Sequence, residues 1–422
     1  MKKIDFPPLG TPIFPASQSI SANAPFHLLP PQAKAIAILR RQGPLSRTEI
    51  ADYTGYSRST ITTTINQLTD LGIIEEIGDG ETSGGRRPRM LNFKADFGYV
   101  VGVDVGATSV DCAIADFSRH ILASGSREID VREGPEVTLT IIRDMVMEAL
   151  KETGISPEKI YGFGIGVPGP VDFAAGVLIA PPIMPGWNGY PIREFIRETF
   201  TQAVVVVDND VNVMALGELR YGAGMLHENF IFVKVGTGIG AGIVAKGAIY
   251  RGADGCAGDI GHICADRSGP ICHCGNIGCL EAIAAGPAIA ARATEAMNAG
   301  KSAIFAKYAA QHNGILTAVD VGRAASEGDP VANQIIHESG RFIGEVLATL
   351  VNFFNPSMIL IGGGVSNIGH QFLAAIRRGV LHRSLPLSTR HLRIDISPMG
   401  AQAGVFGAIA LAMEHVFAVE GE

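Results

Sequence analysis

The chain lacks any apolar run long enough to cross a lipid bilayer. Its N-terminus also lacks the continuous hydrophobic core of a secretory signal, although Lys2 and Lys3 supply positive charge there. We therefore expect a cytoplasmic protein that makes no membrane contact.

Cysteine is scarce, with six among 422 residues, which argues against a disulfide framework. Half of these cysteines crowd together at Cys272, Cys274 and Cys279. In a reducing compartment such a cluster is typical of metal binding. The remaining cysteines, which we expect to be ordinary thiols, are Cys112, Cys256 and Cys264.

No strong excess of one charge marks the chain, whose formal net charge is −7. Residues 31–95 carry nine Lys and Arg against seven Asp and Glu, whereas all other residues together carry 25 against 34. A slightly basic module on an acidic body fits a protein that contacts nucleic acid with one end only. The excess is small, so charge alone does not decide the function.

Glycine, by contrast, is abundant, with 52 residues that lie mostly after residue 100. This predicts many tight turns and ligand-facing loops. The length predicts two or three domains. We expect a flexible arm over residues 1–30, a DNA-binding domain over 31–95 and a larger domain over 96–422.

Three helices are predicted in the slightly basic module. Apolar spacing places the first over residues 33–41, and Gly43-Pro44 ends it. Ser46 and Glu49 form a capping box that starts the second helix, and Ser57 caps the third after a tight turn. This order is typical of a helix-turn-helix.

The third helix has two different faces. Ile61, Ile65 and Leu68 recur at helical spacing and are expected to pack on the first two helices. The opposite face carries short hydrogen-bonding side chains and one arginine, which suit base edges in a major groove. A glycine-rich hairpin over residues 78–85 then leads to arginines that can contact phosphates or enter a minor groove. The predicted DNA contacts are Arg58, Ser59, Thr60, Thr63, Asn66, Arg86, Arg87 and Arg89.

Helix-turn-helix modules of this size also occur in protein–protein interactions. Here the capped second helix, the short turn and the arginine-bearing wing occur together and in order, which favours DNA binding.

Glycine-rich turns follow several apolar strands of the larger domain. The first lies between apolar runs at 99–104 and 110–115, where backbone N–H groups can hold phosphate oxygens and Asp104 can hold the water shell of a metal ion. Similar turns occur at 236–242 and 362–364. Each turn alone is more often structural, but their shared order favours a nucleotide site. The candidates are Asp104, Gly106, Thr108, Thr237, Gly238, Gly363 and Gly364.

A polar segment, residues 208–212, follows the apolar run at 204–207 and begins another helix. A carboxylate at a strand end beside a helix N-terminus can bind a hydroxyl and accept its proton. This segment is therefore a candidate for binding a ligand hydroxyl group.

The strongest local signal is His262 followed by Cys272-x-Cys274-Gly275-x-x-Gly278-Cys279. One imidazole and three thiolates complete a tetrahedral zinc set, and the glycines let the loop fold back. Four protein ligands predict a structural zinc ion, because a catalytic one keeps a position open for water. His273 and Cys264 are nearby alternatives as ligands.

The order of these motifs resembles that of the ROK family (repressor, open reading frame, kinase) over residues 31–415. The resemblance implies an α/β, two-lobed, actin-like and hexokinase-like fold, here preceded by an α+β winged helix-turn-helix domain. It also implies a histidine associated with both sugar and zinc. The sugar-binding residues implied are Asn209, Asp210, Asp259, His262 and Glu281, with Asp210 as the catalytic base in the kinases.

Two departures from the family kinases concern the phosphate and sugar sites. Ala107 and Ser109 stand in a loop that is usually Asp-x-Gly-Gly-Thr followed by a polar residue, and a methyl group at Ala107 would crowd phosphates. Asp259 stands where the kinases generally have Glu, so its carboxylate reaches less far. Asp210 is retained, which leaves phosphoryl transfer open.

Two functions are therefore weighed. The favoured one is a sugar-responsive regulator, a repressor of carbohydrate metabolism genes, because a metabolic kinase would not need a DNA-binding module. A sugar or sugar phosphate would close the cleft and alter the spacing of two DNA-binding domains on double-stranded operator DNA, in a homodimer or a dimer of dimers. The alternative is an ATP- and Mg²⁺-dependent sugar kinase that carries a regulatory DNA-binding domain.

Overall fold

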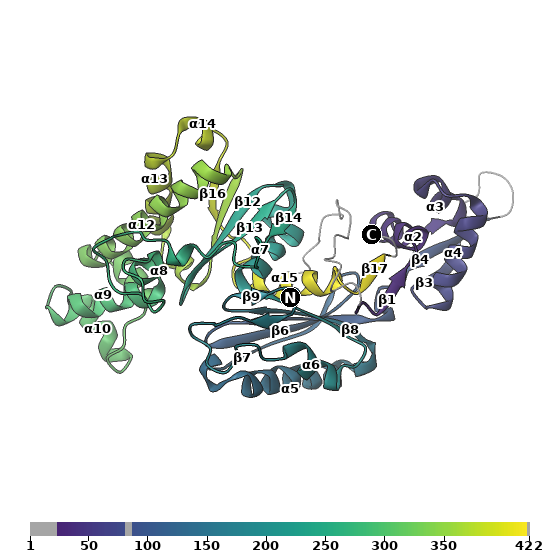
Figure 1. Cartoon of the computed structure of the whole chain (residues 1–422), viewed down its shortest axis with the longest axis horizontal. Helices are drawn as coiled ribbons and strands as arrows, with labels where there is room; N and C mark the ends of the chain where they lie inside the picture. The colour runs from purple at the N-terminus through teal and green to yellow at the C-terminus, as the bar shows by residue number, and fades with distance from the viewer. Residues whose placement is uncertain (1–22, 81–86, 420–422) are drawn as a thin grey trace.

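The computed structural model describes residues 23–80 and 87–419 and shows a small domain beside a larger, two-lobed one (Figure 1). Among these residues, no helix combines the length and apolar character needed to cross a membrane. The larger domain is of the mixed α/β type, and the small domain combines three helices with a three-stranded sheet.

The small domain is a winged helix. The Ser46 hydroxyl accepts a hydrogen bond from the Glu49 amide at 3.3 Å, and the Glu49 carboxylate accepts one from the Ser46 amide at 2.8 Å, which confirms the predicted capping box. Ile61, Ile65 and Leu68 are fully buried, as their spacing predicts. The elements are α2 (Pro30–Gln42), β2 (Leu45–Ser46), α3 (Arg47–Thr54), α4 (Arg58–Asp70), β3 (Ile74–Asp79) and β4 (Arg89–Phe93), with sheet order β2-β4-β3.

The segment before α2 differs from the flexible arm expected over residues 1–30. Residues 1–22 lie outside the described part, but Phe26–Leu28 form β1, which pairs in parallel with β17 (Phe417–Val419) near the other end of the chain. The Phe26 ring packs 4.8 Å from the Tyr161 ring, centroid to centroid, and Leu28 is buried. These apolar contacts give a defined structure to a segment that its proline-rich composition predicted to be flexible.

The larger domain contains two five-stranded sheets with the same arrangement. Their orders are β11-β8-β5-β6-β7 and β14-β13-β12-β15-β16. In each sheet three consecutive strands pair antiparallel, and two later strands extend the sheet in parallel. This repetition produces the two lobes. The strands are β5 (Tyr99–Val105), β6 (Ser109–Asp116), β7 (Ile121–Glu128), β8 (Ile160–Val167), β11 (Val204–Asn209), β12 (Phe230–Val235), β13 (Ile239–Ala245), β14 (Ala248–Tyr250), β15 (Met358–Gly362) and β16 (Arg393–Ile396), with a small hairpin of β9 (Val171–Asp172) and β10 (Val177–Leu178).

Two helices, α7 (Asp210–Tyr221) and α15 (Gln402–Met413), pack on one another between the sheets. Close packing of α15 requires bare backbone, since a Cβ atom at Gly164 of β8 would lie 1.9 Å from the carbonyl oxygen of Ala408. Helices α5 and α6 cover the outer face of the first sheet (Figure 1). The other helices are α5 (Pro135–Thr153), α6 (Ile192–Thr199), α8 (Leu280–Ala284), α9 (Gly286–Asn298), α10 (Ala303–Gln311), α11 (Ala318–Ser326), α12 (Pro330–Phe354), α13 (His370–Arg383) and α14 (Pro386–Thr389).

Candidate functional site

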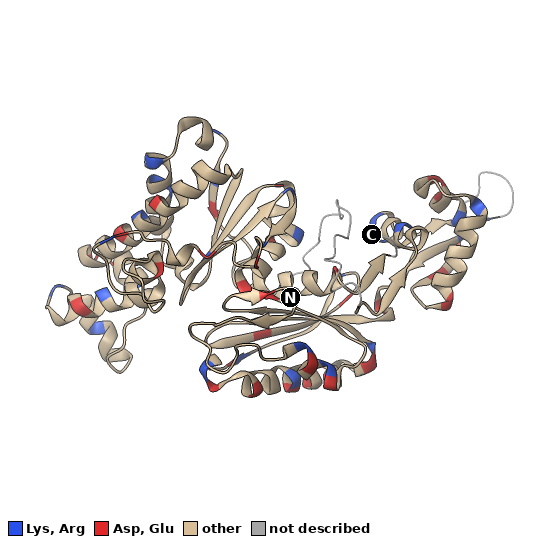
Figure 2. Cartoon of the chain, viewed as in Figure 1, with Lys and Arg blue, Asp and Glu red and all other residues tan. Residues whose placement is uncertain are grey.

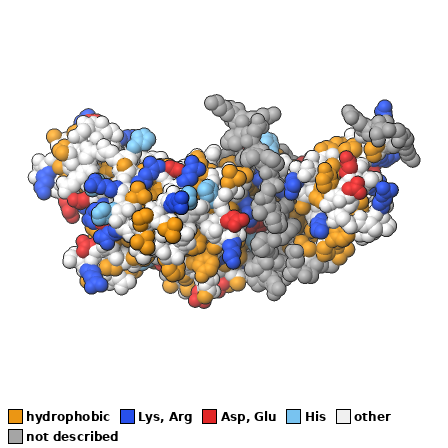
Figure 3. Space-filling model, turned by 90° about the horizontal axis from the view of Figure 1, so that it is seen from above, with side chains coloured by type: hydrophobic (Ala, Val, Ile, Leu, Met, Phe, Trp, Pro, Cys, Tyr) orange, Lys and Arg blue, Asp and Glu red, His pale blue; other side chains and the backbone are white. Residues whose placement is uncertain are grey.

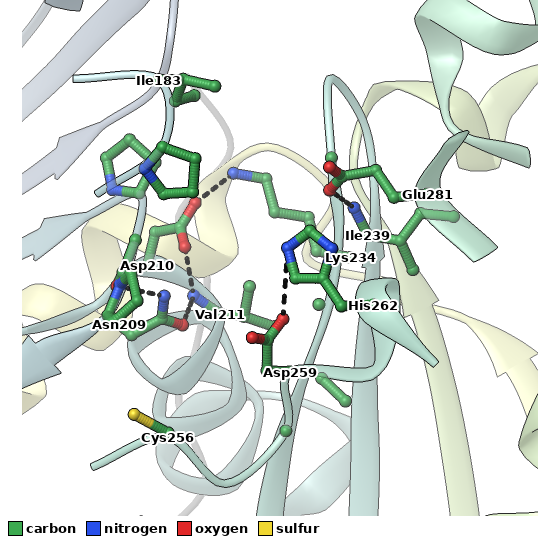
Figure 4. Close-up of a pocket in the computed structure, with 18 of the residues that line it drawn as sticks. Ile183, Asn209, Asp210, Val211, Lys234, Ile239, Cys256, Asp259, His262 and Glu281 are labelled. Atoms are coloured by element: carbon green, nitrogen blue, oxygen red, sulfur yellow. Dashed lines mark hydrogen bonds and ion pairs between the residues drawn. The ribbon is translucent and has the colours of Figure 1, made fainter. Parts of the chain in front are cut away.

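A cavity of ≈ 350 Å³ lies at the carboxyl end of β11 and is lined by residues of both lobes. Its size is at the lower end of the range for small-ligand sites. All of the predicted sugar-binding side chains line it, and Figure 4 shows them around one space. These side chains are Asn209, Asp210, Asp259, His262 and Glu281.

One side of the cavity, the α7 wall, consists of Asn209, Asp210 and Lys234. Asn209 caps α7, because its Oδ1 accepts hydrogen bonds from the amides of Val211 at 2.9 Å and Asn212 at 3.3 Å. Its Nδ2 donates to the Gly169 carbonyl at 3.0 Å. These bonds hold the Asn209 amide before any ligand binds.

Asp210 is also held by the protein. Its Oδ1 accepts from the Val211 amide at 2.9 Å, and its Oδ2 accepts from the Lys234 ammonium (Figure 4). Only 5% of the Asp210 side chain is exposed. The carboxylate is therefore a fixed acceptor that faces the cavity.

Sequence reasoning missed Lys234, although it is the single charged residue within β12. Burial disfavours the Lys234 ammonium, but the carboxylates of Asp210 and Asp104 outweigh burial and raise the pKa of Lys234 above its usual range. Lys234 therefore remains charged at neutral pH. A lone charge in an apolar strand was the signal that could have identified it.

The opposite side, the cysteine-loop wall, consists of Asp259, His262 and Glu281. Glu281 accepts a hydrogen bond from the Ile239 amide at 3.0 Å. A Cβ atom at Gly238 would lie 2.5 Å from the Glu281 carboxylate, so this glycine permits the close approach. Asp259 Oδ1 lies 3.9 Å from His262 Nε2.

Behind this wall, the structure brings together the four predicted metal ligands, His262, Cys272, Cys274 and Cys279, whose ligand atoms all lie within 4.8 Å of one another. Cys272 Sγ is 3.6 Å from His262 Nδ1, and Cys274 Sγ is 3.6 Å from Cys279 Sγ. A tetrahedral ion with Zn–S bonds of about 2.3 Å has ligand atoms about 3.7 Å apart. The donor set and its spacing fit zinc.

The two alternative ligands do not join this group. His273 lines the cavity instead, and Cys264 lies outside the group. The loop closes through Gly278, which has φ +75° and whose Cβ atom would lie 1.6 Å from the Asp266 carbonyl oxygen. This supports the predicted role of glycine in folding the loop back.

The cysteine thiols have different electrostatic environments. A hydrogen bond from the Asn276 backbone lowers the pKa of Cys274 to about 7, whereas burial raises the pKa of Cys279 to about 12. A bound cation deprotonates a coordinating thiol outright. Burial disfavours the Cys279 thiolate, and a bound metal ion would supply the positive charge that stabilises it.

The predicted nucleotide residues are only partly gathered at this cavity. Thr237 and Gly238 line it, together with Ala107. Gly363 has φ +85°, and its Cβ atom would lie 2.5 Å from the Val235 carbonyl oxygen, so packing and backbone conformation both require glycine at this position. The candidates that are not among the lining residues are Asp104, Gly106, Thr108, Gly363 and Gly364.

Asp104 lies at the end of β5 and is 8% exposed. Burial raises its pKa to about 7, against the opposing effect of Lys234. Its Oδ1 has no hydrogen-bond partner among the described residues. Asp104 is thus a buried carboxyl group close to the ionic pair of the α7 wall.

On the small domain, Arg58, Ser59, Thr63 and Asn66 are exposed along α4, and Thr60 is half-buried. Arg86 lies outside the described residues. Arg87 is exposed, while Arg89 forms an ion pair with Glu76 at 2.5 Å. Both basic and acidic residues lie on this domain (Figure 2), and charged and hydrophobic side chains intermingle on the face in Figure 3. The helix face therefore indicates DNA binding better than bulk charge does.

These features define a winged-helix protein whose larger domain has the architecture of sugar kinases. Residues 100–415 match the ROK family, and residues 28–83 match the MarR family. The chain belongs to the ROK family.

Two curated relatives of this chain are a repressor and a kinase. The xylose repressor of Caldicellulosiruptor bescii is 32% identical over 374 residues, which cover 88% of this chain and 92% of the repressor. The glucokinase of Halalkalibacterium halodurans is 36% identical over 310 residues, which cover 73% of this chain and 93% of the kinase. The similarity to the repressor thus extends over more of this chain.

Among solved structures, a ROK family transcriptional regulator described as a homologue of the E. coli MLC protein has a TM-score of 0.77 at 25% sequence identity. The match covers 91% of this chain and 95% of that one. Both domains are therefore needed to account for the match.

Proposed function

We propose that the protein is a sugar-responsive transcriptional repressor whose effector is a neutral sugar. The observation that carries this proposal is the presence, in one chain, of a winged helix and a cavity lined by fixed carboxylate and amide groups. Such groups bind sugar hydroxyls and reject ligands that leave them unpaired. Similarity to the xylose repressor over both domains supports the assignment.

Charge favours a neutral sugar over a sugar phosphate. Asp210, Asp259 and Glu281 line the cavity, whereas Lys234 already forms an ion pair with Asp210. A phosphate group would meet an excess of negative charge. Sugar phosphates therefore serve as the competing ligands in the test below.

We infer that Zn²⁺ occupies the cysteine cluster and acts structurally. Zinc would neutralise the thiolates and fix His262 through Nδ1, leaving Nε2 protonated and directed at the cavity. In that tautomer Nε2–H donates to a sugar hydroxyl or to Asp259. The cysteine-loop wall then recognises sugar through one donor and two carboxylates.

Helix α7 supplies a route from the cavity to the DNA-binding domain. The helix begins at Asp210 and ends at Tyr221. The Arg119 guanidinium lies over the Tyr221 ring, 5.0 Å from its centroid. In the same loop, the Phe117 carbonyl accepts a hydrogen bond from Arg40 of α2 at 2.8 Å. A sugar that moves α7 would therefore alter the position of the winged helix on the larger domain.

We further propose that the protein acts as a homodimer or a dimer of dimers on double-stranded DNA, with α4 in the major groove. Helix-turn-helix proteins read two half-sites related by two-fold symmetry. A monomeric mass by light scattering at micromolar concentration would contradict this part of the proposal.

A sugar kinase dependent on ATP and Mg²⁺ is the second candidate. In this case Asp210 would be the catalytic base; Thr237 and Gly238 line the same cavity, and the similarity to the glucokinase extends over 73% of this chain. The winged helix would then regulate an enzyme.

Calorimetric titration with neutral pentoses, hexoses, amino sugars and their phosphates, with and without ATP and Mg²⁺, separates these functions. The proposal expects saturable binding of a neutral sugar without turnover. Steady heat from ATP consumption would establish the kinase instead. Exclusive binding of a sugar phosphate would overturn the neutral effector.

A further inference from the structure

Lys234 lies in the sugar cavity next to two carboxyl groups. Its ammonium donates a hydrogen bond from strand β12 to Asp210 Oδ2, and its side chain is 22% exposed. Asp104, from β5 of the other lobe, is close enough to stabilise the same ammonium. Residues of both lobes thus converge on one lysine.

This geometry limits what Asp210 can do. A general base must have a free basic oxygen within reach of the proton that it accepts. Here Oδ1 already accepts from the Val211 amide, and Oδ2 accepts from an ammonium. Asp210 can still accept a hydrogen bond from a sugar hydroxyl through a remaining lone pair, but it is poorly suited to remove that proton.

The ammonium also brings to these carboxyl groups the positive charge that a divalent cation would otherwise supply. Two carboxyl groups that converge in a buried site repel one another unless a cation lies between them. Lys234 supplies that charge from the chain itself. The Ala107 methyl group, which lines the same cavity, further narrows the room beside it.

We propose that Lys234 is the resident cation of the sugar cavity, fixing Asp210 as a hydroxyl acceptor and replacing a divalent metal ion. The cavity consequently binds its sugar without Mg²⁺ or nucleotide and does not phosphorylate it. This inference rests on the proposed function, because it assigns Lys234 a role in a sugar sensor.

The test compares wild type with Lys234→Met, Lys234→Arg and the double variant Lys234→Met/Asp210→Asn. Sugar affinity is measured by calorimetry with and without millimolar MgCl₂. We expect wild type to bind equally well in both conditions. Lys234→Met loses at least about tenfold in affinity without Mg²⁺, as removal of one partner of a buried ion pair does, and regains part of it with Mg²⁺. Lys234→Arg, which keeps the charge, remains close to wild type.

Thermal unfolding provides a readout that does not depend on the sugar. Lys234→Met should lower Tm, and adding Asp210→Asn should restore part of it, because the second change removes the uncompensated carboxylate. Magnesium should raise the Tm of Lys234→Met but not that of wild type.

Equal sugar affinity and equal Tm for wild type and Lys234→Met would overturn the inference, as would a requirement of wild type for Mg²⁺. If wild type binds no sugar, the proposed function fails. The unfolding experiment then still decides whether Lys234 serves as the internal cation.

Discussion

The two walls of the sugar cavity are held in place by different means. In the α7 wall, Asn209 and Asp210 are fixed by backbone amides at a helix N-terminus and by the Lys234 ammonium. In the cysteine-loop wall, His262 is positioned through a cluster of three thiols that fits a zinc ion. The polypeptide alone holds the first wall, whereas we propose that a bound metal ion holds the second.

This difference separates recognition from signalling. The α7 wall is continuous with a helix whose last residue packs against Arg119, in the loop that is hydrogen-bonded to α2, so it is suited to transmit ligand binding. The cysteine-loop wall lines the cavity from the opposite side. We expect damage to one wall to have effects that damage to the other does not reproduce.

The largest effect should come from breaking the cysteine-loop wall with Cys279→Ser. Structural zinc sites contribute apparent binding free energies of about 10 kcal/mol, so loss of one ligand should lower Tm strongly and abolish sugar binding. Calorimetric unfolding together with metal analysis measures both. The control is Cys256→Ser, which alters an exposed cysteine that lines the same cavity but lies outside the cluster. Retention of zinc and Tm by Cys279→Ser would contradict the account.

The ionic network behind the α7 wall is tested by Asp104→Asn. Because burial raises the folded-state pKa of Asp104 to about 7, the folded protein binds this proton more tightly than the unfolded chain. Wild-type stability should therefore fall as pH rises from about 4 to about 7, by up to about 4 kcal/mol from this group. Asp104→Asn should flatten that slope in denaturant unfolding. The exposed Asp144→Asn serves as control, and an unchanged slope in Asp104→Asn would refute the assignment.

Signalling along α7 is tested by Arg119→Ala. This change removes the guanidinium from the Tyr221 ring at the junction with the DNA-binding domain, and Arg119 is not among the residues that line the cavity. Coupling free energies between sites are typically about 1–3 kcal/mol. The effect of sugar on DNA affinity should therefore shrink by about fivefold, which corresponds to about 1 kcal/mol. Sugar affinity in the absence of DNA should stay the same. A control is the exposed Arg378→Ala, and equal sugar responses in both variants would exclude this route.

The smallest effect should follow Asn209→Ala, which removes the α7 cap. Loss of an N-cap costs about 1 kcal/mol of stability. Sugar affinity should fall as well, while zinc content should remain unchanged because the cysteine-loop wall is intact. Loss of zinc in this variant would show that the two walls are not independent.

Sequence reasoning succeeded where interactions are local. The Ser46 capping box, the buried stripe of α4 and the hairpin that follows Tyr99 depend on residues that are near one another in the chain. The metal cluster was likewise predictable, because its cysteines share one loop. The order of the motifs also identified the two-lobed fold.

Features that depend on distant pairing were missed. The pairing of Phe26–Leu28 with the C-terminal strand has no local signature, and composition alone placed those residues in an arm. Lys234 pairs with Asp210 only because the fold brings strand β12 next to the first residue of helix α7. The positive φ of Gly363 and its closeness to the Val235 carbonyl likewise depend on the fold.

Control of DNA binding by a sugar in the cavity is best examined by measuring DNA affinity with and without the sugar. Operator DNA is first selected by the full-length protein from a random library, and fluorescence anisotropy is then recorded with the sugar identified by calorimetry. The account predicts that a neutral sugar weakens operator binding, and that Asp210→Asn abolishes this response while still binding the operator. Operator affinity that is unaffected by any sugar that fills the cavity would contradict it.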